Sequence, residues 1–255
     1  MLYKYRSFKS QYKYDVFTKK EVYLASPQEF NDPFESKPQL IGLDTFKERE
    51  EIVDRIIKKS HADLKYKQKK SLKKQILIRL SDKSTAEEDI SALLKSFGIL
   101  SLSSKWDQVL MWSHYSDSHQ GFCIGFEFDD IFDHDVGLHQ VVTYEEEYPK
   151  LHPDIFINND IKTYNEGLIK TLVATKSRQW SYEDETRYIK TAKDGGSGVY
   201  KFKGKKLKEV VIGAYTSTED KKELLDVLSK HMPWVNIYQA KLSKYKYEVT
   251  KEPII

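Results

Sequence analysis

Apolar and polar residues alternate with a period of two along several short stretches of the chain, which is the pattern of β-strands. On this pattern we predict strands at 2–8, 22–26, 99–103, 122–128, 141–148, 181–189, 207–215, 234–242 and 245–250. Asn31-Asp32-Pro33 interrupts the pattern, because proline has no backbone N–H to donate and asparagine and aspartate favour turns. This turn could lie beside a cleft, or Phe34 could simply close it as an apolar plug.

Between residues 44 and 97 the period changes to that of a helix. The stretch contains no proline or glycine, and apolar residues recur three and four positions apart. We predict two or three helices there, with Gly98 as the cap that ends the last one. Further helices are predicted at 107–115, 158–176 and 218–230. These elements predict an α+β fold: a mixed, mostly antiparallel sheet in a single domain, 1–255, with a helical insertion at about 44–97.

The composition fits a folded cytoplasmic protein. Hydrophobic residues make up 39% of the 255 residues, which is enough for one sizeable core. Cys123 is the single cysteine, so no internal disulfide can form, and its apolar neighbours predict a buried, unreactive thiol. No apolar run approaches the roughly 18 residues of a membrane span, and the N-terminus has no hydrophobic signal region, so we expect no membrane partner.

Charge predicts no general affinity for nucleic acid, because 42 basic and 39 acidic residues leave a net charge of only +3. Lys65–Lys74 is a local exception, with six lysines and one tyrosine. This run could contact phosphates, or it could be the solvated surface of the helical insertion. Arginine is scarce and occurs only six times, so we expect an arginine inside a motif to be there for its planar fork of donors.

Four runs of residues occur in a characteristic order along the first three quarters of the chain. They are YKYRS at 3–7, FNDPFE at 30–35, SLSS at 101–104 followed by LMWSHYSDSHQGFCIGF at 110–126, and WSYEDETRYI at 180–189. Together they resemble a bacterial family known as domain of unknown function twenty-nine seventy-one. That resemblance implies no activity by itself. It implies a bacterial protein of the mobile, toxin-like or phage-defence repertoire, including antiviral defence by abortive infection.

A second order of residues concerns chemistry: an arginine on the first strand, Ser-x-Ser on a middle strand and Glu-x-Glu on a late strand. Here these are Arg6, Ser101 with Ser103, and Glu183 with Glu185. The order resembles the arginine–serine–glutamate class of ADP-ribosyltransferases, which implies an ADP-ribosyltransferase-like fold and NAD as the substrate. The acceptor of the ADP-ribose could be a protein, a nucleic acid or water.

The same resemblance implies a role for each residue. Glu185 would stabilise the positive charge that develops on the ribose as nicotinamide leaves, with Glu183 as the second carboxylate. Ser101 would support Glu185 from the neighbouring strand. Arg6, with Ser103, would hold the pyrophosphate, and Tyr5 or Tyr115 would stack on the nicotinamide ring.

Strand geometry makes an independent prediction about the late motif. Alternate residues of a strand share a face, so Glu183, Glu185 and Arg187 would project together, while Asp184 would project oppositely. Two such carboxylates lie about 7 Å apart at their Cα atoms. Burial of two carboxylates is costly unless a cation pairs with them, and Arg187 is positioned on the strand to do so. The alternative is a solvated strand face with an ordinary ion pair.

Two other functions remain open at this stage. The chain could be a non-catalytic sensor or interaction module of a defence system, in which the motifs only shape the fold. It could also be a metal-dependent nuclease, with Asp32, Glu35, Glu183 and Glu185 around a divalent ion.

Metal ligation could also involve His114, Asp117 and His119, although their spacing across a helix end matches no strong metal signature. Capping and turn hydrogen bonds suit these three residues better, so we assign no metal ligands. The sequence leaves the oligomeric state open.

Overall fold

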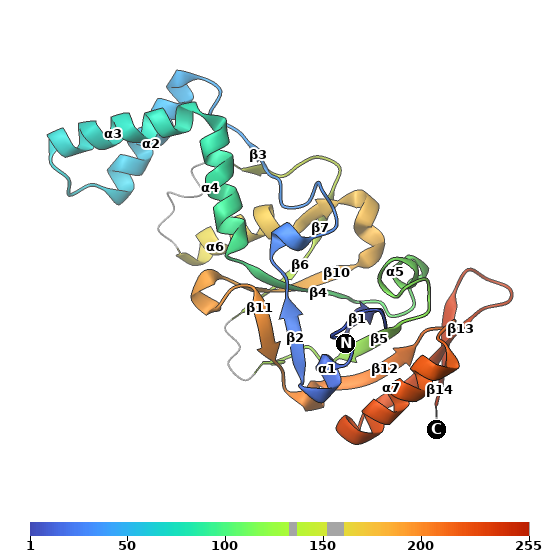
Figure 1. Cartoon of the computed structure of the whole chain (residues 1–255). Coiled ribbons are helices and arrows are strands. Elements are labelled where there is room, and N and C mark those ends of the chain that lie inside the picture. Colours follow the sequence, from blue (N-terminus) through green and yellow to red (C-terminus); the bar gives the residue numbers. More distant parts are fainter. Residues whose placement is uncertain (133–136, 152–160, 255) are drawn as a thin grey trace. The chain divides into compact units, whose positions relative to one another are not determined.

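A computed structural model of the chain describes residues 1–132, 137–151 and 161–254 (Figure 1). Its residues form two compact units, each built from separate stretches of sequence. The sheet unit comprises Met1–Ala25, Gly98–Val141 and Gln179–Ile255, and the helical unit comprises Ser26–Phe97 and Val142–Arg178. The single-domain organisation expected from the sequence stays a prediction.

The sheet unit is built on eight strands in the order β14-β13-β12-β5-β1-β4-β10-β6. Their bounds are β1 (Leu2–Arg6), β4 (Gly98–Ser103), β5 (Phe122–Phe126), β6 (Leu138–Val141), β10 (Glu185–Lys190), β12 (Leu207–Ile212), β13 (Asn236–Leu242) and β14 (Val249–Pro253). Only β12 and β13 pair in parallel among these described strands; the other neighbours are antiparallel. The predicted α+β class and mixed, mostly antiparallel sheet are therefore confirmed, and β1 and β4 are neighbours in this sheet.

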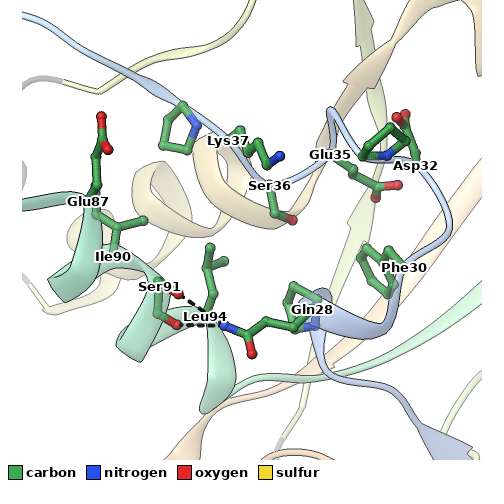
Figure 2. A pocket seen from close by; sticks show the side chains of 13 residues that line it. Gln28, Phe30, Asp32, Glu35, Ser36, Lys37, Glu87, Ile90, Ser91 and Leu94 are labelled. Atoms are coloured by element: carbon green, nitrogen blue, oxygen red, sulfur yellow. Dashed lines mark hydrogen bonds between the residues drawn. The ribbon is translucent and has the colours of Figure 1, made fainter. Parts of the chain in front are cut away.

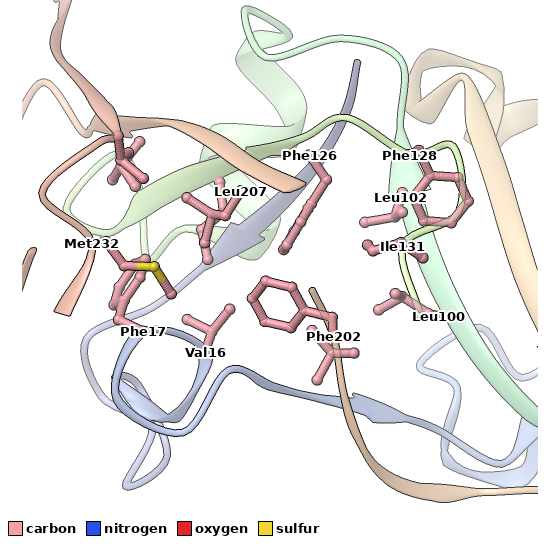
Figure 3. Packing of buried hydrophobic residues seen from close by; sticks show 14 of the residues in the cluster. Val16, Phe17, Leu100, Leu102, Phe126, Phe128, Ile131, Phe202, Leu207 and Met232 are labelled. Carbon is pink, nitrogen blue, oxygen red and sulfur yellow. The ribbon is translucent and has the colours of Figure 1, made fainter. Parts of the chain in front are cut away.

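Alternation along the central strands buries both faces of this sheet. On one face Phe126, Leu100 and Leu102 pack with Phe17 and with the rest of a large apolar cluster (Figure 3). Helices α1 (Asp15–Thr18) and α7 (Thr218–His231) contribute to this cluster. So does a two-stranded sheet of β2 (Glu21–Leu24) and β11 (Gly198–Lys201). Each fully buried leucine or phenylalanine contributes about 1.5–3 kcal/mol to folding.

The opposite face of the sheet packs against helix α5 (Val109–Tyr115). Tyr5 and Cys123 are directly paired across β1 and β5, and both lie against Trp112 and its neighbours in a second apolar cluster. Cys123 has no exposed surface, so the predicted burial of this thiol is confirmed.

The helical unit contains the predicted insertion as three helices, α2 (Phe46–Ser60), α3 (Tyr66–Ser81) and α4 (Lys83–Lys95). Thr45 begins α2 through a capping box, in which its hydroxyl accepts from the Glu48 N–H at 3.2 Å and the Glu48 carboxylate accepts from the Thr45 N–H at 2.8 Å. α3 carries the lysine-rich run, and every one of its residues is at least partly exposed.

The rest of the helical unit comprises shorter elements from both of its stretches. They are the 3₁₀ turn η1 (Pro27–Glu29), helix α6 (Ile161–Val173), and two parallel pairs, β3 (Gln39–Leu40) with β8 (Lys150–Leu151) and β7 (Thr143–Glu145) with β9 (Thr175–Ser177). The sheet unit also contains the 3₁₀ turns η4 (Ala192–Asp194) and η5 (Gly204–Lys206).

Several predicted boundaries are wrong for identifiable reasons. The strand expected at 141–148 is two strands, because β6 pairs with β10 whereas β7 pairs with β9. The helix expected at 158–176 ends at Val173, and 158–160 lie outside the described residues. Gly98 does not cap α4, since Ser96 does; Gly98 opens β4, where the backbone of Gly196 lies too close for any side chain.

The strand expected at 181–189 begins only at Glu185. The preceding residues form the 3₁₀ turn η3 (Arg178–Glu183), and Asp184 has a φ of +45°. This left-handed residue joins the turn to β10, and its N–H donates to the Ser181 carbonyl at 3.3 Å. Glu183 therefore does not share a strand with Glu185 and Arg187.

Candidate functional site

Glu185 and Arg187 form a closed, buried ion pair on β10. The Arg187 Nε donates to Glu185 Oε1 at 2.8 Å, and its Nη2 donates to Glu185 Oε2 at 2.9 Å. Their side chains are only 5% and 1% exposed. Because the two residues are two positions apart on one strand, they share a face, as the alternation predicted. The bidentate geometry fixes the direction of the carboxylate.

The two serines of the middle motif lie beside this pair. In the antiparallel register of β10 and β4, Ser103 is opposite Glu185 and Ser101 is opposite Arg187. Opposed residues of neighbouring strands project from the same face, so all four share one side of the sheet. Ser103 is buried, and its hydroxyl accepts from the Lys105 N–H at 3.0 Å.

Glu183 is positioned by the η3 turn and not by strand β10. It is 3% exposed, and its Oε1 accepts a hydrogen bond of 2.6 Å from the Tyr115 hydroxyl at the end of α5. A phenol bonded to a carboxylate at this distance is a strong, charge-assisted interaction. Tyr115 thus holds the second carboxylate in place, a contact that strand alternation did not predict.

Lys4 is a functional candidate that sequence reasoning missed. Its Nζ donates to the Ser101 carbonyl at 3.0 Å, and burial lowers its pKa to about 8. The charge of Arg6 lowers that pKa further, whereas Glu185 and Glu183 raise it. Lys4 is therefore within electrostatic reach of all three residues. The sequence did contain a signal that could have identified Lys4: it lies two residues before Arg6, so the two side chains share a face of β1.

The order of the motifs suggested that Arg6 lies beside Glu185, but its side chain lies elsewhere. Its partner in the register is Phe122, so its side chain leaves the face of β1 opposite to that of Tyr5. The Nη2 donates to the Tyr12 carbonyl at 3.2 Å, and burial lowers the pKa of the guanidinium. Because Tyr3 is opposite Ser103 and Ser103 is opposite Glu185, Arg6 projects from the face of the sheet opposite to that of Glu185, and the structure does not bring these two candidate residues together. The charges of both residues act on the pKa of Lys4.

Tyr5 is a core residue. It is 4% exposed, its hydroxyl donates to the Lys105 carbonyl at 2.9 Å, and its ring meets Trp112 edge-on at 5.2 Å. Tyr115 is only half-buried. Of the two tyrosines proposed to stack on nicotinamide, Tyr115 has the more accessible ring.

A second aromatic group lies next to Tyr115. Trp180 and Tyr182 are both half-buried, with ring centroids 5.9 Å apart, and the exposed His114 ring lies 6.4 Å from Trp180 and 6.1 Å from Tyr182. Such partly exposed rings could stack on a flat ligand.

The three candidate metal ligands around α5 point to different partners. Asp117 pairs with Lys9 at 2.7 Å, and His119 stacks on Trp112 with its Nε2 3.4 Å from the Ser113 hydroxyl. Asp117, Ser118 and His119 all have positive φ, between 50° and 66°. In the described part of the chain, no group of three or more histidine, cysteine, aspartate or glutamate side chains is placed to hold a metal ion.

The carboxylates of the FNDPFE run belong to the helical unit. Asp32 makes the expected turn, because its Oδ1 accepts from the Phe34 N–H at 2.9 Å. Glu35 pairs with Lys176 at 3.5 Å, and both side chains are buried. Phe34 is 62% exposed, so it is not the apolar plug considered from the sequence.

The fold and these contacts define an α+β protein with a buried charged cluster on one face of its sheet. Residues 111–188 match the model of a family described as "Protein of unknown function (DUF2971)", which supports the first of the two resemblances. The matched segment contains Tyr115, Glu183, Glu185 and Arg187. No curated protein and no solved structure matches the chain. In the residues that the structure describes, no helix is both long and apolar enough to span a membrane.

Proposed function

We propose that the sheet unit cleaves the nicotinamide–ribose bond of NAD, in the manner of an ADP-ribosyltransferase of a bacterial defence or toxin-like system. One observation carries the proposal. The strands that bear Arg6, the Ser-x-Ser motif and Glu185 are the consecutive neighbours β1-β4-β10 of one sheet, although they lie far apart in the sequence. The Ser-x-Ser motif and Glu185 share one face of this sheet, whereas Arg6 projects from the other face. Lys4 of β1 donates to the Ser101 carbonyl.

In the proposed reaction the bond between the ribose C1′ and the nicotinamide nitrogen breaks, and its electron pair leaves with nicotinamide. Glu185, oriented by Arg187, stabilises the positive charge that develops at C1′. A nucleophile of the acceptor then bonds to C1′. Its proton passes to Glu183, which the Tyr115 hydroxyl holds, and from there to solvent.

Lys4, whose Nζ reaches the Ser101 carbonyl, supplies a cation for the pyrophosphate. An ammonium with a pKa of about 8 is mostly charged at neutral pH, and a bound pyrophosphate would favour that charged form further. Tyr115, Trp180 and Tyr182 provide ring faces for the nicotinamide.

The test is nicotinamide release, measured by mass after the pure protein is incubated with NAD and a bacterial extract as the source of acceptor. Glu185→Gln removes the charge but little volume, so release should fall roughly a hundredfold or more. Asp184→Asn is the matched control. Asp184 is half exposed and bonds the Ser104 hydroxyl, and asparagine tolerates its positive φ.

Glu185→Gln also leaves Arg187 buried without its counter-charge, which costs about 3–5 kcal/mol and could unfold the protein. Tyr115→Phe is therefore a second test of the proposal, because it removes one hydroxyl and keeps the ring. Release should fall at least about tenfold in this variant, with its melting temperature close to that of the wild type. Unchanged release in folded Tyr115→Phe and Glu185→Gln, or no release by the wild type with any extract, would remove the proposal.

A specific observation also favours the second candidate, a non-catalytic sensor or interaction module. Both carboxylate oxygens of Glu185 are engaged by Arg187 inside the protein, as in a structural ion pair. In that case the double variant Glu185→Gln, Arg187→Met should fold. It should also still bind the molecule that the module recognises. The ADP-ribosyltransferase proposal expects the same double variant to release no nicotinamide.

A further inference from the structure

The helical unit contains a cavity of about 570 Å³, a volume suited to a small organic ligand. Its wall comes from the segment around η1 and the FNDPFE run and from α4 (Figure 2). The lining residues are Pro27, Gln28, Phe30, Asp32, Pro33, Glu35, Ser36, Lys37, Pro38, Glu87, Ile90, Ser91 and Leu94. The cavity thus lies beside the turn of the FNDPFE run, for which a neighbouring cleft was one of the two alternatives left open by the sequence.

Two residues of this wall each have one buried polar side-chain atom without a hydrogen-bond partner among the described residues. Ser36 is 9% exposed and Asp32 is 5% exposed. Within the described part of the chain, neither the Ser36 hydroxyl nor the Asp32 Oδ2 has a partner. Native proteins pair nearly all such groups, so an unpaired pair beside a cavity indicates that something else satisfies at least one of them. In Figure 2 the Ser36 hydroxyl points into the space between Leu94 and Phe30.

The backbone of Ser36 is also strained. Its φ is +59°, a left-handed conformation that glycine adopts easily and serine does not. Local strain of this kind persists where the conformation serves a purpose, and here it directs the hydroxyl into the cavity. A serine at a position suited to glycine points to a use for its oxygen.

The remaining polar groups favour a ligand that donates hydrogen bonds. Gln28 already uses its amide nitrogen on the Ser91 hydroxyl at 3.0 Å, so its other amide atom is an acceptor. Of the described residues that line the cavity, three carry carboxyl groups, Asp32, Glu35 and Glu87, and one carries an amine, Lys37. The Glu35 charge is also answered by Lys176. The excess of acceptors and negative charge disfavours an anion.

The rest of the wall is apolar and rigid. Phe30, Ile90 and Leu94 provide flat and branched surfaces, and three prolines complete the wall. Such a lining removes water from a ring and holds it by packing.

We propose that this cavity binds a small amine with a flat apolar body, whose N–H groups donate to the Ser36 hydroxyl while the carboxylates supply the complementary charge. The ring lies against Phe30 and Leu94. This site belongs to the helical unit and does not depend on the NAD chemistry proposed for the sheet unit.

Three probes of similar shape test the ligand class: tryptamine, its hydroxyl analogue tryptophol, and indole-3-propionate. Titration calorimetry on the full chain should show tryptamine binding at least about tenfold more tightly than indole-3-propionate, with tryptophol between them. Equal affinity for the amine and the carboxylate, or no binding of any probe at millimolar concentration, overturns the proposal.

Ser36→Gly tests the residue. Glycine relieves the strain and removes the unpaired hydroxyl, so the melting temperature should rise by about 2–4 °C while tryptamine affinity falls at least about tenfold. Ser118→Gly in the sheet unit is the matched control, because Ser118 has a φ of +54° and is exposed. This control should also stabilise the protein but leave tryptamine affinity unchanged. Unchanged affinity in Ser36→Gly contradicts the assignment of the hydroxyl.

Discussion

The thiol of Cys123 illustrates how burial controls chemistry at the scale of one residue. β1 and β12 flank it on both sides within the sheet, and the packing of α5 covers its face. Burial raises the pKa of this thiol well above its usual value, and the neighbouring charge of Glu209 adds to the effect. A thiolate, the reactive form, is therefore disfavoured.

We predict that a thiol reagent such as dithionitrobenzoate modifies native Cys123 at least about a hundredfold more slowly than the denatured chain. The reason is that modification requires the sheet to open first. Spectrophotometric labelling at pH 8 with and without guanidinium chloride measures both rates. Comparable rates would show that the strand is not enclosed in solution.

The burial of His119 predicts how the stability of the folded protein depends on pH. Burial lowers the pKa of His119 in the folded protein, so below about pH 6.5 the unfolded chain binds a proton that the folded chain resists. Stability therefore rises with pH through this range and is lost on acidification, by up to about 1.4 kcal/mol per pH unit. Denaturant unfolding between pH 5 and pH 7 would measure the slope.

The comparison that isolates this histidine uses two variants. His119→Asn suits the positive φ of the position and should flatten the slope. His114→Asn changes an exposed ring and should leave the slope as it is in the wild type. A wild-type slope in His119→Asn would assign the acid sensitivity to other groups.

At the scale of the element, the end of a helix and the start of a strand were harder to predict than the elements themselves. Gly98 was expected to cap a helix through a left-handed conformation. The requirement for glycine is steric instead, because a Cβ at Gly98 would be 2.0 Å from the Gly196 carbonyl oxygen. The chain needs glycine there for close approach of two backbones.

Gly98→Ala should therefore destabilise the sheet unit by about 1–3 kcal/mol or more, since backbone and not a flexible side chain must move. Gly204→Ala is the control, because its new Cβ would meet only the flexible Lys20 side chain, at 3.0 Å. Thermal unfolding of the two variants measures the difference. Equal melting temperatures would show that the β4 start can shift without cost.

At the scale of the whole molecule, the chain leaves the sheet unit after Ala25 and returns at Gly98. The two ends of this excursion are hydrogen-bonded neighbours: the Ala25 N–H donates to the Ile99 carbonyl at 2.9 Å, and the Ile99 N–H donates to the Ala25 carbonyl at 2.8 Å. A long insertion between paired residues costs the sheet little loop entropy and leaves its hydrogen bonds intact.

Replacement of Ser26–Phe97 by an Asn-Gly link should therefore leave a folded sheet unit. Asn-Gly suits a tight connection between antiparallel partners. Circular dichroism should show the loss of α2, α3 and α4 with the strand signal retained, and Cys123 should keep its slow labelling. Rapid labelling or an unfolded spectrum would show that the sheet depends on the helical unit.

The sequence by itself determined the features that depend on neighbours along the chain. Alternation predicted the strands, helical spacing predicted the insertion, and the residues around Cys123 predicted its burial. Alternation also placed Glu185 and Arg187 on one face. These predictions succeed because backbone periodicity and turn preference are local properties.

Only the tertiary structure decided which residues meet. It made β1, β4 and β10 neighbours, brought Tyr115 to Glu183, placed Lys4 beside the charged cluster, and set the strained Ser36 beside a cavity. It also turned Tyr182 and Glu183 into a 3₁₀ turn where alternation indicated a strand. The physical reason is that strand order, left-handed backbone conformations and unpaired buried groups depend on packing between distant segments, which no local pattern records.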